Sequence, residues 1–345
     1  MGEKGELHLE KIYDFLLNSL DDRVSIEGFA FEPIKLGGLY WSLTAISLLK
    51  GPPNSIVHPK TNETLESMSI HFLSQSKNED GAFGFGPKHP SNLIATHYAI
   101  LVLALINRMD FINVNDVVKF ISSLQVRSLT EIFIKNRDGS FSSDKYGESD
   151  CRNSYSALVC LSLLGGLNNI DLKRAVDFIL SCKNFDGGFG WQPLNESHAA
   201  ACFCCVGALA ELDLLSLIDS DKLGFWLSER QNKDGGLNGR PEKDSDICYS
   251  WWILSVLCNI GIFTSFILDL VKFIIESQNQ VDGGIAYFPG YMGDVCHTFF
   301  ALCGISLIDS KGHNLTQIHP IYATTLESAE RLKLFKSEQT QHNRV

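Results

Sequence analysis

The sequence predicts an all-α protein in which helical repeats of about 48 residues close into a six-hairpin α/α barrel. An Asp-Gly dipeptide recurs along the chain, and the intervals between its copies are 58, 48, 48 and 48 residues. A long run rich in Ala, Leu, Cys and Ser follows each copy, without the alternation of a β-strand. The last such run is as apolar as the central ones, whereas an open stack needs a polar terminal repeat. The Asp-Gly copies begin at Asp80, Asp138, Asp186, Asp234 and Asp282.

Each repeat contains two predicted helices. The long apolar runs predict buried inner helices, and the shorter runs before each Asp-Gly predict outer helices. The glycine of each dipeptide supplies the positive φ at which a helix stops and the chain reverses. Residues 1–345 are therefore expected to form one domain, with a loop insertion at 126–135 and a flexible tail at 327–345. The inner helices are expected near 40–49, 96–106, 154–164, 199–209, 248–257 and 298–307.

Composition excludes several classes of protein. The chain has 29 Lys and Arg against 40 Asp and Glu, a net charge of −11. Binding of nucleic acid through contacts to its phosphates is therefore not expected. No apolar stretch reaches the roughly 18 residues of a membrane span, and Met1 to Glu10 lacks a secretory signal. The ten cysteines lie mostly in apolar runs, as expected for reduced thiols in a cytoplasmic protein.

Five polar residues occupy the same repeat position, just before an inner helix. Asp and Asn are favoured N-caps, so helix capping alone is a sufficient explanation for each of them. In a barrel of repeats, however, these positions lie at one end, and their side chains are expected to meet at one rim. The five residues are Asn92, Asp150, His198, Asp246 and Asp294.

A carboxylate, a thiol and an imidazole are expected together on this rim. Asp246 and Cys248 belong to one repeat, and His297 follows Cys248 by 49 residues, one period plus one. One oxygen, one sulfur and one nitrogen ligand leave a fourth tetrahedral position open, as catalytic zinc requires. The alternative is a capping Asp with a buried Cys and a buried His, and spacing alone does not decide. Cys296 is either a spare ligand or a core thiol.

Two further groups of side chains accompany the candidate metal ligands. Arg240, Lys243, His198 and Tyr249 form a candidate anion site suited to a diphosphate, although a solvated loop explains the two cations equally well. Aromatic residues on the inner helices are either ordinary core or the walls of a cavity for a long hydrocarbon. They are Trp41, Tyr155, Phe203, Trp251, Trp252, Phe299 and Phe300.

Several strings resemble the β subunit of protein prenyltransferases over essentially the whole chain. The Asp246-Ile-Cys-Tyr-Ser-Trp-Trp252 string, the compact length and the Ile318-His-Pro-Ile-Tyr322 tail are most similar to the Rab geranylgeranyltransferase (type II) group. The other strings that carry the resemblance are Asn184-Phe-Asp-Gly-Gly-Phe-Gly190, Glu196-Ser-His-Ala-Ala200, Gly235-Gly-Leu-Asn-Gly-Arg-Pro-Glu-Lys243 and Asp294-Val-Cys-His-Thr298.

The resemblance implies a role for individual residues. It makes Asp246, Cys248 and His297 the catalytic zinc ligands, and His198, Arg240, Lys243 and Tyr249 the diphosphate-binding residues. Gly37 matches a position at which farnesyltransferase closes the cavity with a Trp, so a small residue there is expected to leave depth for twenty carbons. Tyr287 stands where related enzymes carry an Asp associated with magnesium, which leaves magnesium dependence open. The implied lipid-pocket residues are Gly37, Trp41, Arg152, Tyr155, Cys204 and Trp252.

The implied reaction transfers geranylgeranyl from geranylgeranyl diphosphate to C-terminal cysteines of Rab GTPases. The resemblance also implies a heterodimer with an α subunit and presentation of Rab by a Rab escort protein. A type I geranylgeranyltransferase or farnesyltransferase β subunit is the alternative within the family. A terpene cyclase would need a D-x-D-D motif, which the chain lacks. A helical-repeat scaffold that binds peptides is the non-enzymatic alternative.

Overall fold

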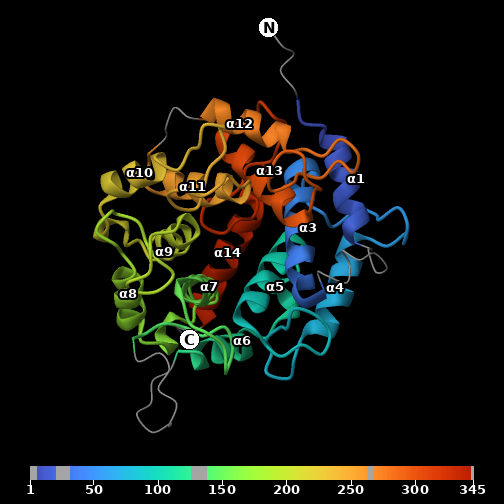
Figure 1. Ribbon diagram of the computed structural model, residues 1–345. Helices are drawn as coiled ribbons and strands as arrows, with labels where there is room; N and C mark the ends of the chain where they lie inside the picture. The colour runs from blue at the N-terminus through green and yellow to red at the C-terminus, as the bar shows by residue number, and fades with distance from the viewer. Residues whose placement is uncertain (1–5, 21–31, 126–137, 263–266, 343–345) are drawn as a thin grey trace.

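Six inner helices form a closed ring in the computed structural model, which describes residues 6–20, 32–125, 138–262 and 267–342. Each inner helix contacts the next along the chain, and the last contacts the first, which closes the ring (Figure 1). The predicted closed α/α barrel is therefore confirmed. The inner helices are α3 (Lys35–Lys50), α5 (Leu93–Leu105), α7 (Cys151–Leu163), α9 (Ala199–Glu211), α11 (Cys248–Asn259) and α13 (Val295–Asp309).

The outer helices lie around this ring and precede the Asp-Gly turns or, for α1, the first inner helix. The inner helices are buried on nearly every side, whereas an outer helix such as α8 buries one face, through Ala175, Phe178 and Ile179. The predicted insertion at 126–135 lies outside the described residues. The outer helices are α1 (Leu9–Leu20), α4 (Leu65–Ser76), α6 (Val114–Ser123), α8 (Leu172–Ser181), α10 (Ser220–Ser228) and α12 (Ile267–Glu276).

Short 3-10 helices join the longer elements. One leads into α3 at Glu32–Ile34, and three connect inner to outer helices at Met109–Phe111, Leu167–Asn169 and Leu215–Leu217. Isolated antiparallel bridges such as Lys183 with Phe189 pin the Asp-Gly turns. Among the described helices none is long enough and apolar enough to cross a lipid bilayer.

The Asp-Gly turns pack closely against the next outer helix. Gly139 has a φ of +90°, and a Cβ on it would lie 2.3 Å from the carbonyl oxygen of Arg174 in α8. Gly283 has a φ of +86°, and a Cβ on it would lie 2.6 Å from the carbonyl oxygen of Lys11 in α1. Only glycine fits both the backbone conformation and this approach. Helix α1 thus takes the place of the next outer helix after the last Asp-Gly turn.

Two glutamine side chains bind the backbone at the start of an outer helix in the same way. Gln125 accepts from the amide of Asp171 at 2.8 Å and donates to its carbonyl at 3.0 Å, just before α8. Gln278 accepts from the amide of His8 at 2.9 Å and donates to its carbonyl at 3.2 Å, just before α1. The N-terminal helix therefore closes the outer layer by the contacts that join neighbouring repeats elsewhere.

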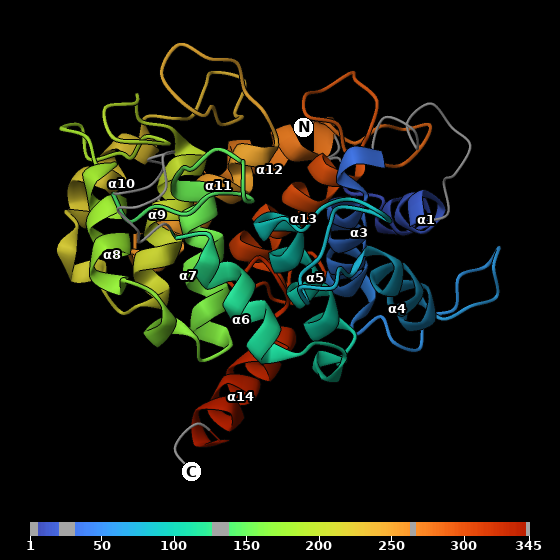
Figure 2. The same ribbon diagram turned by 90° about the horizontal axis from the view of Figure 1, so that it is seen from below.

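The C-terminal region is a helix, which corrects the expectation of a flexible tail for residues 327–342. Helix α14 (Leu326–His342) lies across the C-terminal ends of α5 and α7 (Figure 2). Ala329 and Leu332 are buried, and Arg331 donates to the carbonyls of Ala104 and Leu105 at 3.2 and 3.1 Å. The sequence of this helix is mostly polar, so its order depends on partners that local composition does not reveal.

Candidate active site

The inner helices all begin at the end of the ring opposite α14, and polar side chains cap most of them. The side chains of Asn92, Asp150, His198 and Asp294 each accept a hydrogen bond from an amide in the first turn of their helix. Asp246 lies one residue before the N-cap position of α11, and its Oδ1 accepts from the amide of Cys248 at 2.8 Å. The expected rim therefore exists, and its residues serve as caps as well. The positive ends of the helix dipoles meet there.

The rim brings Asp246, Cys248 and His297 together. A carboxylate oxygen, the thiol sulfur and an imidazole nitrogen of these residues all lie within 4.8 Å of one another. Nε2 of His297 lies 3.5 Å from Oδ1 of Asp246. All three side chains are half-buried, so a ligand can reach them from the rim. The structure thus places the three residues as repeat spacing predicts.

Asp294 orients the imidazole of His297. Its Oδ2 lies 2.6 Å from Nδ1 of His297, and its Oδ1 accepts from the His297 amide at 2.9 Å. Because Nδ1 is held in this way, Nε2 is the nitrogen that faces Asp246 and Cys248. A carboxylate on the far nitrogen of a metal-bound His fixes the ring and raises its basicity. Sequence reasoning placed Asp294 on the rim but missed this role, which its position three residues before His297 signals.

The electrostatics of this group fit a cation. Burial lowers the pKa of His297, but hydrogen bonds and charge from Asp246 and Asp294 outweigh it and raise the pKa to about 9. Burial, together with the Asp246 carboxylate, raises the pKa of the Cys248 thiol well above its usual value. The oxygen, sulfur and nitrogen donors and the oriented imidazole match the requirements of a zinc site with one open position. Cys296 lies outside this group of converging donor atoms.

The candidate anion-binding residues lie on the neighbouring part of the rim. The Tyr249 hydroxyl is 3.4 Å from Nε2 of His198, and their ring centroids are 5.8 Å apart. Burial and the positive charge of Arg240 lower the pKa of His198, which favours the neutral imidazole. Arg240 donates to Glu196 at 2.6 Å, a partner that sequence reasoning missed. Lys243 is exposed on the loop that follows Arg240.

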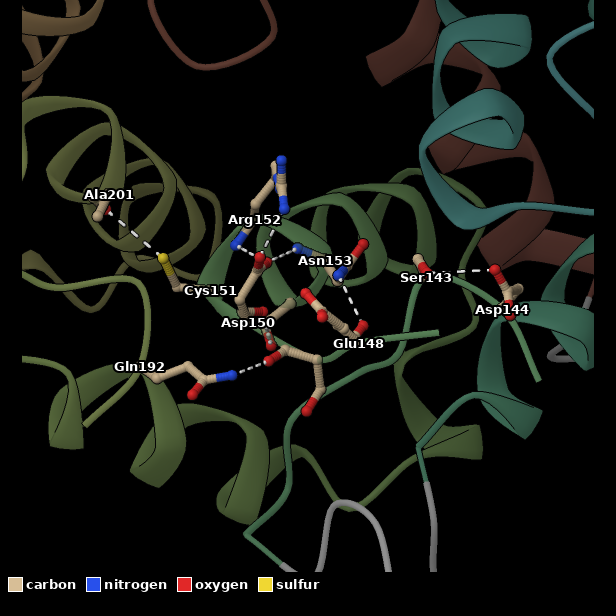
Figure 3. Close-up of polar contacts among 11 residues, drawn as sticks. Ser143, Asp144, Glu148, Asp150, Cys151, Arg152, Asn153, Gln192 and Ala201 are labelled. Carbon is tan, nitrogen blue, oxygen red and sulfur yellow. Dashed lines mark hydrogen bonds and ion pairs between the residues drawn. The ribbon is translucent and has the colours of Figure 1, made fainter. Parts of the chain in front are cut away.

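Arg152 differs from the other residues expected in a lipid pocket. Its guanidinium is exposed, donates to Oδ2 of Asp150 at 2.8 Å and lies 5.6 Å from the Trp191 ring centroid. Figure 3 shows the side chain extending away from the loop that carries Glu148, while Asn153 turns back and donates to the carbonyl of Glu148 at 3.2 Å. Arg152 is therefore a cation of the rim rather than part of a buried apolar wall.

A closed circuit of aromatic rings, here called the aromatic belt, runs around the inside of the barrel. Neighbouring ring centroids lie between 4.6 and 6.5 Å apart, and every inner helix contributes at least one ring. Sequence analysis singled out only the members from α7 onward. The others share their repeat position, which is the signal that finds them. In order, the belt consists of Tyr40, Tyr98, His97, Tyr155, Phe203, Trp252, Phe300 and Phe299.

Gly37 lies against two aromatic rings. A Cβ on Gly37 would lie 3.3 Å from Cη2 of Trp41 and 3.4 Å from Cε2 of Tyr98. The missing side chain is thus replaced by the rings of these two neighbours. Trp41 and Tyr98 are themselves half-buried, 6.1 Å apart between centroids, and in edge contact. Gly37 permits their packing, and any added depth depends on where these rings stand.

A cavity of about 620 Å³ reaches the rim residue Asp294. It lies among α1, α3, α4 and the loop before α13, and Phe15, Trp41, Met68 and Phe72 are among its walls. Asp294, which orients His297, also lines it. Its walls mix apolar and polar side chains, and neither the three candidate metal ligands nor the aromatic belt is among the residues that line it.

Tyr287, at the position where the resemblance implies a magnesium-associated Asp, packs against two other aromatic rings. The Tyr287 ring centroid is 6.0 Å from that of His297 and 4.6 Å from that of Tyr291. Neither ring offers a carboxylate, so the structure adds no support for magnesium at Tyr287.

Comparisons with known proteins agree with the fold. A family model described as the prenyltransferase alpha-alpha toroid domain matches residues 7–324. The chain is 39% identical over 167 residues to the geranylgeranyl transferase type-2 subunit beta of Saccharomyces cerevisiae, covering 48% of this chain and 47% of that one. It is 27% identical over 171 residues to the protein farnesyltransferase subunit beta of Schizosaccharomyces pombe, covering 49% and 40%. The chain thus matches less than half the length of these two relatives.

Solved structures extend the comparison to the whole chain. A structure of Candida albicans protein geranylgeranyltransferase-I complexed with GGPP superposes with a TM-score of 0.81 at 25% identity, covering 96% of this chain and 99% of that one. A type II terpene cyclase from Scytonema has a TM-score of 0.59 at 11% identity over 88% of this chain and 98% of its own, which shows a shared fold alone. Because the family model covers nearly the whole barrel, the chain belongs to the prenyltransferase alpha-alpha toroid domain family.

Proposed function

We propose that this chain is the catalytic β subunit of a Rab geranylgeranyltransferase. The observation that carries the proposal is the convergence of Asp246, Cys248 and His297 at the rim of a barrel with an aromatic interior, with His297 oriented by Asp294. The type-2 subunit beta of Saccharomyces cerevisiae, at 39% identity over about half the chain, supports type II over the alternatives. The farnesyltransferase relative is 27% identical over a similar length.

The reaction forms a thioether. The sulfur of an acceptor cysteine bonds to C1 of geranylgeranyl diphosphate, the C1–O bond breaks, and the diphosphate leaves with its electron pair. Zinc held by Asp246, Cys248 and His297 would supply a position at which the acceptor thiol loses its proton to solvent. The role of Asp294 is to keep Nε2 of His297 turned toward the other two ligands.

The cationic part of the rim would receive the leaving group. Arg240 and Lys243 supply positive charge, and the Tyr249 hydroxyl supplies a hydrogen-bond donor beside neutral His198. These groups are already in place before charge develops on the diphosphate, so little reorganisation is needed. The ion pair of Arg240 with Glu196 would open when a diphosphate takes the guanidinium.

The apolar surfaces would hold the isoprenoid. The aromatic belt, Trp41 and Cys204 would offer a hydrocarbon wall behind the rim. Transferring roughly twenty carbons out of water at about 0.8 kcal/mol per methylene is a large gross gain. This gain favours a long isoprenoid over a short one.

Partners complete the proposal. We propose a cytoplasmic heterodimer with an α subunit, acting on Rab GTPases that a Rab escort protein presents. The test is co-expression with a candidate α subunit, followed by transfer of labelled geranylgeranyl to Rab with and without escort protein and zinc. Escort-dependent transfer is the expected result. Transfer to short C-terminal peptides without escort protein would instead assign the chain to the type I or farnesyl group.

A helical-repeat scaffold that binds peptides is the non-enzymatic alternative. It requires neither metal nor isoprenoid. Elemental analysis of the purified complex therefore separates the two functions, because one zinc per chain is expected only for the enzyme.

A further inference from the structure

One backbone hydrogen bond recurs at the starts of five inner helices. In each case an amide at the start of the helix donates to the carbonyl of the residue five positions after the Asp of the following Asp-Gly turn, at 2.7 to 2.9 Å. The amides are those of Leu36, Leu93, Cys151, Ala199 and Ile247, and the carbonyls are those of Phe85, Ser143, Trp191, Gly239 and Tyr287. The five carbonyls belong to equivalent positions of the repeat, and each holds the start of an inner helix at the rim.

Of the five residues that supply these carbonyls, Gly239 alone has no side chain, whereas three are aromatic. The ring of Trp191 lies 5.1 Å, between centroids, from that of His198, and the ring of Tyr287 lies 6.0 Å from that of His297. The two neighbouring repeats thus place an aromatic ring beside a histidine of the rim at the position where Gly239 places none.

The ring of Tyr249 takes the space beside Gly239. A Cβ on Gly239 would lie 2.3 Å from the hydroxyl oxygen of Tyr249, 2.4 Å from its Cζ and 2.6 Å from its Cε1, and these would be the three nearest heavy atoms. The φ of Gly239 lies outside the left-handed region, so its backbone conformation is open to other residues. Glycine is therefore needed here for the approach of Tyr249 and not for the conformation of the loop.

The Tyr249 hydroxyl that enters this space lies beside His198. Its oxygen is 3.4 Å from Nε2 of His198, while Nδ1 of the same ring accepts from the amide of Ala200 at 3.2 Å. A ring nitrogen that accepts a hydrogen bond carries no proton, so these contacts assign the proton to Nε2, which donates to the hydroxyl oxygen. The hydroxyl proton of Tyr249 is then free to be donated to an anion on the rim.

We propose that Gly239 is a positioning residue of the diphosphate site and that it acts through Tyr249. This inference rests on the proposed function. The carbonyl of Gly239 holds the first amide of α9, its missing side chain admits the Tyr249 hydroxyl, and Arg240 follows it in the chain. An added methyl group would displace the hydroxyl from His198, because ordinary contacts with a Cβ begin near 3.4 Å. The site would then lose a donor that is in place before the diphosphate arrives.

The test is a double-mutant cycle on the assembled complex, with inorganic diphosphate as the ligand and isothermal titration calorimetry as the measurement. We expect Gly239→Ala to weaken binding about tenfold, because the displaced hydroxyl no longer donates to a charged ligand. Tyr249→Ala removes the same donor, and a loss of similar size is expected. The double variant Gly239→Ala/Tyr249→Ala should also lose about tenfold rather than about a hundredfold, since both changes remove one interaction.

A second variant and a second ligand serve as controls. Gly86→Ala is the matched variant, because Gly86 lies on the corresponding loop after Asp80 and a Cβ there would meet nothing closer than 3.7 Å. Its affinity for diphosphate should equal that of the unaltered complex. Geranylgeraniol, which has the hydrocarbon without the diphosphate, should bind equally well to all the variants, whereas general damage to the barrel would weaken both ligands together.

Unchanged affinity for diphosphate in Gly239→Ala overturns the positioning role and leaves the proposed function standing. A loss of about a hundredfold in the double variant also overturns it, because Gly239 would then act independently of Tyr249. If Gly239→Ala does not assemble, the double variant lacks the ring that the new Cβ would meet and is expected to assemble, and its failure to do so contradicts the inference. Failure of the unaltered complex to bind diphosphate and to transfer isoprenoid overturns the proposed function itself.

Discussion

Oδ2 of Asp294 lies 2.6 Å from Nδ1 of His297, and the same carboxyl group caps the helix on which His297 stands. One side chain thus sets both the start of α13 and the direction of its imidazole. The helix cap and the metal centre are therefore mechanically linked, because a shift of the cap turns Nε2 away from Asp246 and Cys248. This relationship suggests a substitution that separates the two roles.

Asp294→Asn should weaken zinc binding without melting the start of α13. Asn is as good an N-cap as Asp, but its neutral side chain cannot provide the negative charge that supports His297. Second-layer substitutions of this kind typically cost about 10 to 100-fold in metal affinity. Competition with a zinc-binding dye measures the affinity, and circular dichroism checks the fold. Unaltered affinity in Asp294→Asn would show that Asp294 is a cap only.

Cys248→Ala should abolish both zinc binding and isoprenoid transfer. The variant removes the sulfur ligand, and the two remaining donors are too few for a tight catalytic site. Cys296→Ala is the matched control, because Cys296 stands at the same repeat position on α13 but outside the converging donors. Metal analysis of both purified variants gives the answer. Full zinc content in Cys248→Ala would refute the ligand assignment.

Gly37→Trp should shift donor preference toward farnesyl diphosphate. The new ring has to displace Trp41 and Tyr98, whose atoms stand 3.3 and 3.4 Å from the position of a Cβ. The displaced rings then reduce the depth available to the isoprenoid. Gly38→Ala is a control for backbone effects on α3, because a Cβ there meets nothing within 4 Å. Donor competition assays measure the ratio, and an unchanged preference would contradict the role of this position.

Acid should destabilise the protein partly through His97 in the aromatic belt. Burial lowers the pKa of His97 from 6.5 to about 4, so the unfolded chain binds a proton at a pH where the folded chain does not. The folded state is thus favoured above pH 6.5, and this stability is lost as the pH falls toward 4. The loss is at most about 3 kcal/mol for this group.

His97→Phe keeps a ring in the belt and removes the titration. We expect the free energy of unfolding of this variant to change less between pH 7 and 4.5 than that of the unaltered protein. Urea unfolding at the two pH values measures the difference. An equal loss of unfolding free energy in both proteins would show that other groups cause the acid sensitivity.

Most of the barrel was predictable because each repeat consists of the same elements, a pair of helices and an Asp-Gly turn. The 48-residue period in the Asp-Gly dipeptides indicates where each helix pair ends, and Gly139 and Gly283 confirm that the glycine is needed for both its φ and its packing. The period also brought Cys248 and His297 onto neighbouring helices. A regular fold converts spacing along the chain into proximity, so a metal site between repeats is visible in the spacing.

Non-repeating parts of the molecule were not predictable in this way. Helix α14 was expected to be a flexible tail, since its order comes from Arg331 and Lys336 bonding to the ends of distant helices. The rings of Trp41 and Tyr98 beside Gly37 were not predictable either, and the depth that Gly37 leaves for an isoprenoid stays a prediction.

The amino-acid sequence by itself determined the repeat, the ring of inner helices and the three donors that meet at one rim, because these follow from periodic spacing. Only the tertiary structure decided how the ring is closed at its far end, which rings stand around its interior and which carboxylate turns His297. The closure depends on contacts between residues hundreds of positions apart, such as Tyr40 with Ala323, whereas the other two features depend on side-chain directions that the spacing does not specify.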